Sequence, residues 1–266
     1  AETEEDFKKS WHFVRDNLHD LTEKNIDVNE IRQLILILAV KGRLVAHNTD
    51  DKDIAVTLSE VAKKKQELIT QKVIKKQWKF NPISQNKQPF LLPKNWEWVH
   101  LLDCVERVTV GHVGSVQNRY VDKGIPFLRS QNVRENCFDS SGLVYINPEF
   151  HKELKKSKLA PGDVVVVRSG NVGTACVIPE TLSEANCADL VAIKQPMAII
   201  PQFLSYYINS AAKSHVREGT VGIALTHFNT KSVAELPVPL PPLEEQKRIV
   251  SKVDELMKRC DRVEEN

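Results

Sequence analysis

The 266-residue sequence has few of the features that mark membrane or secreted proteins. Its longest apolar run, residues 34–40, is too short to span a bilayer. Its five cysteines are odd in number and have no CxxC spacing, which argues against a disulfide framework and a structural zinc site. The first residues are acidic, whereas a signal peptide begins with basic ones. We therefore expect a cytoplasmic protein without a membrane segment.

The sequence also has little net charge. Lys and Arg total 37 and Asp and Glu total 35, which gives +2. This balance excludes a polycation that holds nucleic acid by bulk charge, but it leaves open a protein whose basic residues gather on one face. Apolar residues make up 41% of the chain, which is enough for a globular core.

Motifs for catalysis and metal binding are missing as well. The sequence contains no GxxxxGK[ST], GxGxxG or GxSxG motif, and no histidine pair has metal-ligand spacing. Asn147-Pro148-Glu149-Phe150 resembles the amine-binding loop of amino-methyltransferases, but Glu149 replaces its second proline. Glu153-Leu154-Lys155 resembles the end of a nuclease motif and lacks the further carboxylate that such a site needs. The sequence therefore predicts no catalytic residues, no metal and no bound cofactor.

Apolar spacing predicts a helical region over residues 1–80. A first helix carries a stripe over residues 7–21, and a third opens at Thr57 with Glu60 as its capping box and buries Val61, Leu68 and Ile69. The second helix ends at Gly42 and buries Ile31, Leu34, Ile35 and Leu38.

The third helix and the residues after it present a basic face. Such a face is typical of a solvated surface; contact with a phosphate backbone or an acidic partner is the alternative. Its lysines are Lys63, Lys64, Lys65, Lys72, Lys75, Lys76 and Lys79.

Residues 81–93 read as a linker, and periodicity then changes from helix to strand. Residues 94–242 form a domain of short strands between glycine turns, with one helix from Pro201. We predict an α+β fold with an antiparallel or mixed sheet. The expected strands are 125–128, 143–146, 164–167, 175–178 and 190–193.

The proline-rich residues 236–242 must be extended, and residues 243–266 form a helix with two glutamates in its first turn. Its apolar positions alternate in steps of four and three, as in a coiled coil. We predict that this seam docks a partner helix or a missing continuation, with packing on the chain's own domain as the alternative. The candidate interface residues are Ile249, Val253, Leu256, Cys260 and Val263.

Four loops in or beside glycine turns carry side chains that suit base edges, because arginine pairs with guanine and Asn or Gln with adenine. One such loop alone is typical of a solvated turn, whereas four on one domain favour a recognition surface. The first candidates are Arg129, Gln131, Asn132, Arg168, Asn171, His227, Asn229 and Lys231. Gln117, Asn118, Arg119 and Arg217 complete the set.

Several motifs resemble the specificity (S) subunit of type I restriction–modification systems. They are LPKNWEWV at 92–99, GIPFLRSQNV at 124–133, LAPGDV at 159–164 and VPLPPLEEQKRIV at 238–250. Residues 31–45 are similar to the helical leader of the same family. The resemblance covers essentially the whole chain, and the PLPPLEEQ block is its most specific part.

This resemblance implies a non-catalytic DNA-recognition subunit, in which residues 94–242 are a target-recognition domain reading one half of a bipartite site. Residues 243–266 would be a conserved spacer helix, truncated here. The implied partners are double-stranded DNA, methyltransferase subunits carrying S-adenosylmethionine, restriction subunits, and a second half-subunit or the chain's own C-terminal half. Two alternatives stay open: a DNA adenine-N6 methyltransferase and a structural adaptor without DNA specificity. Base-reading positions vary with each target, so the resemblance nominates none of them.

Overall fold

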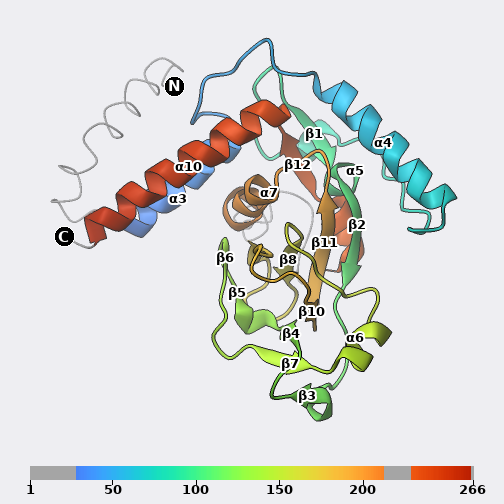
Figure 1. Ribbon diagram of the computed structural model, residues 1–266. Coiled ribbons are helices and arrows are strands. Elements are labelled where there is room, and N and C mark those ends of the chain that lie inside the picture. The colour runs from blue at the N-terminus through green and yellow to red at the C-terminus, as the bar shows by residue number, and fades with distance from the viewer. Residues whose placement is uncertain (1–27, 213–228, 265–266) are drawn as a thin grey trace.

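The computed structural model describes residues 28–212 and 229–264. Figure 1 shows two long helices, α3 (Val28–Val40) and α10 (Leu243–Glu264), lying side by side, with α4 (Ile54–Thr70) on the opposite side of the molecule. The strands lie between and below them. The helix expected over residues 7–21 lies outside the described residues.

Helix α3 ends where the sequence predicts. Gly42 has a φ of 68°, and the amides of Gly42 and Arg43 reach back to the carbonyls of Ala39 and Leu38. This is a Schellman motif, in which glycine adopts the left-handed backbone without a steric penalty. The predicted burial of Leu34 is wrong, because its exposed fraction is 41%. Helix α3 packs against both α10 and α7 (Pro201–Tyr207), which turns its buried side away from Leu34.

Helix α4 begins three residues earlier than predicted. Its N-cap is Asp53, whose carboxylate accepts a hydrogen bond from the amide of Ala55 at 2.8 Å. The predicted capping box is therefore wrong, and Glu60 instead binds Lys52 at 2.7 Å. Only Ile54 and Val61 are buried in this helix, so its contact with the rest of the molecule is thin.

Among the described residues, eight strands form two four-stranded sheets, one antiparallel and one mixed, as the sequence predicts, and two further pairs of strands lie outside them. The first sheet has the spatial order β2 (Val105–Val110), β11 (Leu190–Pro196), β8 (Val164–Val167) and β9 (Ala175–Val177). The second has the order β10 (Asn186–Cys187), β4 (Ile125–Leu128), β7 (Val144–Ile146) and β3 (Tyr120–Val121).

Short elements connect these sheets. They are α5 (Leu101–Cys104), α6 (Pro148–Glu153), α9 (Thr230–Glu235), a π-helical turn η4 (Ile208–Ala212) after α7, the 3-10 turns η1 (Gln85–Lys87), η2 (Gln117–Arg119) and η3 (Ser130–Asn132), and the pair β5 (Val133–Arg134) and β6 (Cys137–Phe138). The predicted strands at 125–128 and 164–167 and the helix start at Pro201 are confirmed.

The proline-rich segment is extended, as predicted, and forms strand β12 (Pro237–Leu240) opposite β1 (Glu97–His100). Within a strand, the amides of alternate residues point to the same edge. The missing N–H groups of Pro237 and Pro239 therefore fall on one edge, and the N–H groups of Val238 and Leu240 remain available on the other. This explains how a run with alternating prolines still pairs with β1.

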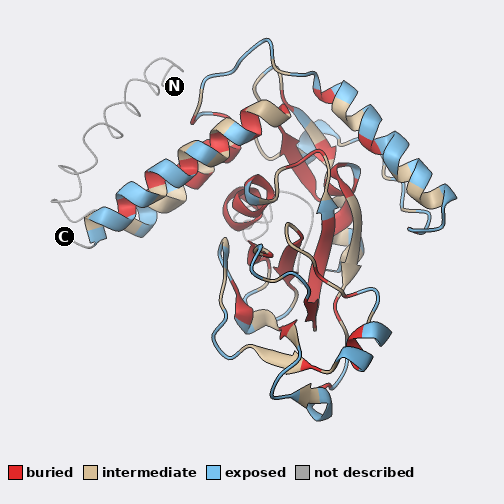
Figure 2. Cartoon of the chain, in the orientation of Figure 1, coloured by how far each residue is buried: buried red, intermediate tan, exposed pale blue. Residues whose placement is uncertain are grey.

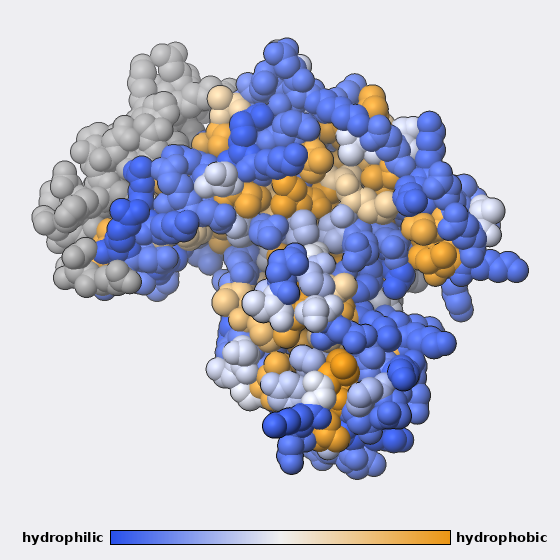
Figure 3. Space-filling view, in the orientation of Figure 1, coloured by the Kyte–Doolittle hydropathy of each residue, from blue (hydrophilic) through white to orange (hydrophobic). Residues whose placement is uncertain are grey.

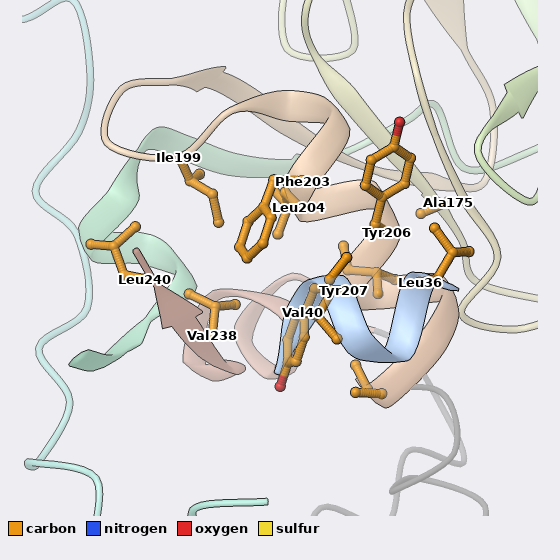
Figure 4. Close-up of a cluster of buried hydrophobic side chains, with 14 of the residues drawn as sticks. Leu36, Val40, Ala175, Ile199, Phe203, Leu204, Tyr206, Tyr207, Val238 and Leu240 are labelled. Atoms are coloured by element: carbon orange, nitrogen blue, oxygen red, sulfur yellow. The ribbon is translucent and has the colours of Figure 1, made fainter. Parts of the chain in front are cut away.

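The main core lies where α3, α7, β12 and the antiparallel sheet meet, and Figure 2 shows buried residues along the facing sides of α3 and α10. Figure 4 shows Phe203, Leu204 and Tyr207 of α7 gathered with Val40 of α3 and Val238 of β12. The Tyr207 hydroxyl donates to the Pro237 carbonyl at 2.7 Å, and burial raises the pKa of this phenol well above its usual range. The core is thus assembled from segments far apart in the sequence.

The predicted C-terminal helix is confirmed, but its seam is covered by the same chain. Ile249, Val253, Leu256 and Cys260 are at most 1% exposed, and α10 packs along α3. The prediction that these residues dock another subunit is therefore wrong for this fold, because α3 already occupies the seam. Val263, the fifth candidate, is half-buried at the helix end.

One glutamate and one glutamine side chain fix the start of α10. The Glu245 carboxylate is fully buried and accepts hydrogen bonds from Asn95 Nδ2 and Trp96 Nε1, both at 2.9 Å, while His47 Nδ1 lies 2.7 Å away. Gln246, also fully buried, accepts from the amide of Ile200 at 2.6 Å and donates to the carbonyls of Ala198 and Pro241. The LEEQ sequence therefore joins three distant segments.

Replacing Leu256 with Ala is expected to lower the free energy of unfolding by about 3 kcal/mol, because it opens a cavity between α10 and α3. Chemical denaturation measures this change. Lys258→Ala, a change at an exposed position of the same helix, is the control. Equal midpoints for the two variants would show that α3 does not cover the seam.

Replacing Glu245 with Ala is expected to cost about 2 to 3 kcal/mol of unfolding free energy, because it leaves the buried indole N–H of Trp96 without an acceptor. Glu244→Ala is the matched control, since it removes the same charge from the same helix turn at a side chain that is not fully buried. A loss of stability in the control as large as in Glu245→Ala would refute the role assigned to Glu245.

Candidate nucleic-acid interface

The segment 168–174 forms the tip of the hairpin between β8 and β9, as the sequence predicts. The Val167 amide donates to the Thr174 carbonyl at 2.8 Å, and the Gly173 amide donates to the Val167 carbonyl at 3.0 Å. These bonds close the turn and leave the Asn171 side chain exposed, with no hydrogen-bond partner among the described residues.

Three of the four predicted loops meet at one bend, residues 187–190. The Ala188 amide donates to the Leu128 carbonyl at 2.9 Å, directly before Arg129. The Asp189 amide donates to the His112 carbonyl at 3.1 Å, and Asp189 also faces Arg168 at 3.6 Å. We call the loops 111–119, 129–134 and 168–173 around this bend the recognition corner.

Gly111 permits this close assembly. A Cβ atom at Gly111 would lie 2.8 Å from the Cys187 carbonyl oxygen, closer than real Cβ atoms approach, and the adjacent amide of His112 donates to that same oxygen at 2.8 Å. Only a residue without a side chain lets the 111–119 loop reach the bend.

The loop after β4 holds two candidates at the surface. Arg129 donates from Nη2 to the Gly142 carbonyl at 2.7 Å and lies over the ring of Tyr120 at 5.9 Å, while its Nε is buried with no hydrogen-bond partner. Gln131 is exposed and lies 3.3 Å from the same carbonyl. Both side chains retain hydrogen-bonding groups for a base edge.

Asn132 is not a reading residue, so this prediction is wrong. Its side chain is fully buried, accepts from the Arg129 amide at 3.0 Å and donates to the carbonyls of Asp139 and Ser141. All of its hydrogen-bonding atoms are therefore used to shape the loop that carries Arg129 and Gln131. The sequence alone gave no sign of this, because a buried loop amide and an exposed one have the same residue type.

The candidates Gln117, Asn118 and Arg119 form the exposed turn η2. Arg119 lies over the ring of Phe150 at 5.2 Å, and His112 contacts the same ring edge-on at 5.7 Å. Helix α6, which carries Phe150, is thus a wall of the recognition corner.

The two enzyme-like segments near α6 serve local structure. Asn147 caps α6, since its side chain accepts from the Phe150 amide at 2.7 Å, and Pro148 occupies the first helical turn. Glu153 is the last residue of α6 and is exposed. Among the described residues, no cluster of three or more His, Cys, Asp or Glu side chains that could hold a metal ion includes Glu149 or Glu153.

The fourth predicted loop is described only at its end. Arg217 and His227 lie outside the described residues. Asn229 caps α9 by accepting from the amides of Lys231 and Ser232, both at 2.9 Å, and Lys231 is exposed. Helix α9 packs against α5 and β2. Asn229 is therefore engaged in capping, and no described contact joins Lys231 to the recognition corner.

Asp189 is a central group that sequence reasoning missed. Its carboxylate accepts from the Ser169 hydroxyl and faces Arg168, and its φ of 50° lies in the left-handed region that Asp tolerates better than most residues. A carboxylate can accept a hydrogen bond from the amino group of cytosine. The predicted loops are marked by cations, amide side chains and glycine turns, whereas residues 187–190 contain no glycine.

A buried ion pair lies at the other ends of β8 and β11, away from the corner. Asp163 is fully buried, binds Lys194, and accepts from the amides of Ala160 and Gln195 at 2.8 and 3.0 Å. Lys194 also donates to the Lys158 carbonyl at 2.7 Å. At the bend itself, burial raises the pKa of the Cys187 thiol to about 12, so the thiol is neutral. Asp163, Lys194 and Cys187 are buried and therefore have a structural role.

Within residues 28–212 and 229–264, no group of three or more His, Cys, Asp or Glu side chains could hold a metal ion. In the same ranges, no helix is both long and apolar enough for a bilayer crossing. What the recognition corner offers is a set of arginine, amide and carboxylate groups at one surface, which is suited to hydrogen bonding with base edges.

Comparison with known proteins identifies related sequences. Residues 93–266 match the family model "Type I restriction modification DNA specificity domain". The chain is 26% identical to the type I restriction enzyme EcoAI specificity subunit of Escherichia coli, covering 97% of this chain and 45% of that protein. It is 25% identical to the EcoEI specificity subunit of the same species, over 99% of this chain and 46% of that protein.

The chain thus spans about half the length of the curated relatives it matches. Among solved structures, the HsdS subunit from Thermoanaerobacter tengcongensis aligns with a TM-score of 0.49 at 18% identity, covering 90% of this chain and 50% of that one.

Replacing Asn132 with Ala is expected to lower the free energy of unfolding by about 2 kcal/mol, because buried backbone groups lose their partners. The neighbouring amide supplies the control: Gln131→Ala removes an exposed side chain and should leave stability within about 0.5 kcal/mol. Thermal or chemical denaturation separates the two. An Asn132→Ala variant as stable as wild type would restore this residue to the reading candidates.

Proposed function

The chain belongs to the family of type I restriction modification DNA specificity domains, and we propose that it is the non-catalytic part of such a system that selects the DNA sequence. In this proposal the recognition corner reads base edges in one half of a bipartite target. Chemistry on the DNA is carried out by other subunits.

The observation that carries the proposal is the convergence of three loops on the 187–190 bend. Arg119 comes from the first loop, Arg129 and Gln131 from the second, and Arg168 and Asn171 from the third, yet main-chain hydrogen bonds anchor the loops to one segment or its sheet neighbours. Reading a short sequence requires several donors and acceptors held in fixed relation, since each base pair is distinguished by its own pattern. Loops tied to one bend supply that rigidity.

A non-catalytic role is supported by how the enzyme-like residues are used. Asn147 caps α6, so its side chain is committed to the Phe150 amide. The relatives are named as specificity subunits. We propose that methyl transfer and cleavage belong to methyltransferase and restriction partners, and that S-adenosylmethionine binds the methyltransferase partner.

The chain spans about half of its relatives' length and contains one recognition corner in the described ranges. A bipartite target needs two reading surfaces, so we propose that the second is supplied by a second half-subunit or by a C-terminal half of the same protein. The outer side of the paired helices α3 and α10 is the proposed surface for the methyltransferase partner, since the inner seam is filled.

Asn171→Ala should relax base discrimination at one or two positions of one half-site, by about 1–3 kcal/mol, because an exposed amide at the hairpin tip can bind adenine bidentately. The measurement is sequencing of methylated sites in cells that carry the intact system with this variant. Asn86→Ala, an exposed asparagine in the turn η1, is the matched control and should leave the site list unchanged.

An unaltered site list for Asn171→Ala would remove this residue from the reading set. If Arg168→Ala and Gln131→Ala were also without effect, the proposal that this corner selects the sequence would be overturned. Loss of all methylation with a normally folded variant would instead indicate that the residue is needed for assembly.

A further inference from the structure

The lysine-rich stretch of the sequence does not lie on one helix. Lys63 and Lys64 are on the exposed side of α4, whereas Lys65 is half-buried and donates to the Leu102 carbonyl, with its pKa lowered by burial. Lys75 and Lys76 follow the helix in a segment that returns beside β2, where Gln77 donates to the Glu106 carbonyl. The chain therefore carries these lysines back onto the strand domain.

This return creates a groove of about 450 Å³ between the segment 73–78 and the edge strand β2. Its apolar side includes Val73 and Trp78, which are 59% and 45% exposed. Figure 3 shows an apolar patch beside the C-terminal end of α4, surrounded by hydrophilic residues. The cations that line the groove are Lys75, Lys76, Arg107, Lys155 and Lys156.

The groove has a strong excess of positive charge. Arg107 is paired with Glu106, but none of the four lysines has a carboxylate oxygen within 4.0 Å in the described ranges. All four are exposed and come from two segments that are far apart in the sequence. The fold brings these lysines together from segments that are far apart in the sequence, so their proximity does not result from spacing along one helix. Such a cluster of positive charge indicates a surface that binds a negatively charged partner.

The groove is continuous with the recognition corner. Lys155 and Lys156 follow α6, whose Phe150 contacts His112 and Arg119. Strand β2 carries Arg107 at the groove, ends at Val110 and leads into the corner at His112. At roughly 3.3 Å per residue, Arg107 and His112 are about 17 Å apart along the chain, which matches about five base-pair steps.

We propose that this groove binds the phosphate backbone of duplex DNA about five base pairs to one side of the bases read at the corner. The proposal rests on the proposed function. Lysine ammonium groups suit phosphates, and four exposed lysines line the groove. An acidic polypeptide would fit the charge alone, but nothing would align it with the corner.

The test compares two triple variants of the full chain with equal loss of charge. The groove triple is Lys75→Gln, Lys76→Gln and Lys156→Gln; the control triple is Lys87→Gln, Lys94→Gln and Lys258→Gln, all exposed and outside the groove lining. Fluorescence anisotropy measures affinity for a labelled duplex as salt rises. The groove triple should flatten the slope of log K against log salt by about 2 to 3, since each phosphate contact contributes roughly 0.9. The control triple should change it by less than about 1.

A second series shortens the duplex from one end. The wild-type chain and the control triple should lose affinity once fewer than about five base pairs remain beside the recognised bases, whereas the groove triple should be insensitive to that shortening. Melting temperatures of all three proteins verify that the folds are intact.

Equal slopes and equal length dependence for the two triples would overturn the groove assignment, and would leave an acidic polypeptide as the occupant to examine. That result differs from failure of the proposed function. Selection from a random duplex pool by the wild-type chain tests the function itself: an enriched sequence supports it whatever the groove does, and no enrichment overturns it together with the groove.

Discussion

The architecture depends on a single buried carboxylate at the start of α10. Glu245 accepts hydrogen bonds from Asn95 and Trp96, which begin the strand domain, and faces His47, which follows α3. A buried charge without such partners would be strongly unfavourable, so these two segments and the helix are fixed together or not at all. Because α10 is fixed there, its apolar side lies along α3, and Arg32 closes the far end by pairing with Asp261 and Glu264. The helical pair and the strand domain therefore form one unit rather than two bodies joined by a linker.

The same rigidity reaches the recognition corner through the antiparallel sheet. Strand β11 lies between β2 and β8, so the end of β2, the start of β11 and the end of β8 occur at the same edge. The order of strands thus places the 111–119 and 168–173 loops beside the 187–190 bend, and the parallel pairing of β10 with β4 adds the loop that begins at Arg129. Only this combination of one antiparallel and one mixed sheet brings the three loops together. Variation of side chains on these loops can change what is read without disturbing the strands that hold them.

The regular elements could be predicted because their signals are local. The all-valine strand at 164–167, the proline at the first position of α7 and the acidic first turn of α10 each act within a few residues. The errors come from long-range packing. Leu34 fits the helical stripe but faces away from α7 and α10, and the heptad pattern of α10 indicates a helical partner without saying that α3 of the same chain is that partner. The prediction for Asn132 was wrong, and Asp189 was not predicted at all, for a related reason: the contacts of a polar loop residue depend on segments remote in sequence.

The near-neutral charge of the chain takes on a different meaning once the cations are located. A total of +2 is compatible with tight DNA binding only if acidic and basic groups are segregated, since phosphate attraction acts over about a Debye length. In the structure several acidic groups are already paired with cations of the same chain: Asp163 with Lys194, Asp51 with Arg248, and Glu264 with Arg32. The four groove lysines, Lys75, Lys76, Lys155 and Lys156, have no carboxylate partner within the described ranges. At the corner, in contrast, Arg168 is paired with Asp189 and Arg134 with Asp139, so part of the positive charge there is neutralised within the protein. The groove, with its four unpaired lysines, is therefore the more basic of the two surfaces. Its phosphate contacts would add affinity on every sequence equally, whereas discrimination between sequences needs the arginine, amide and carboxylate groups of the corner.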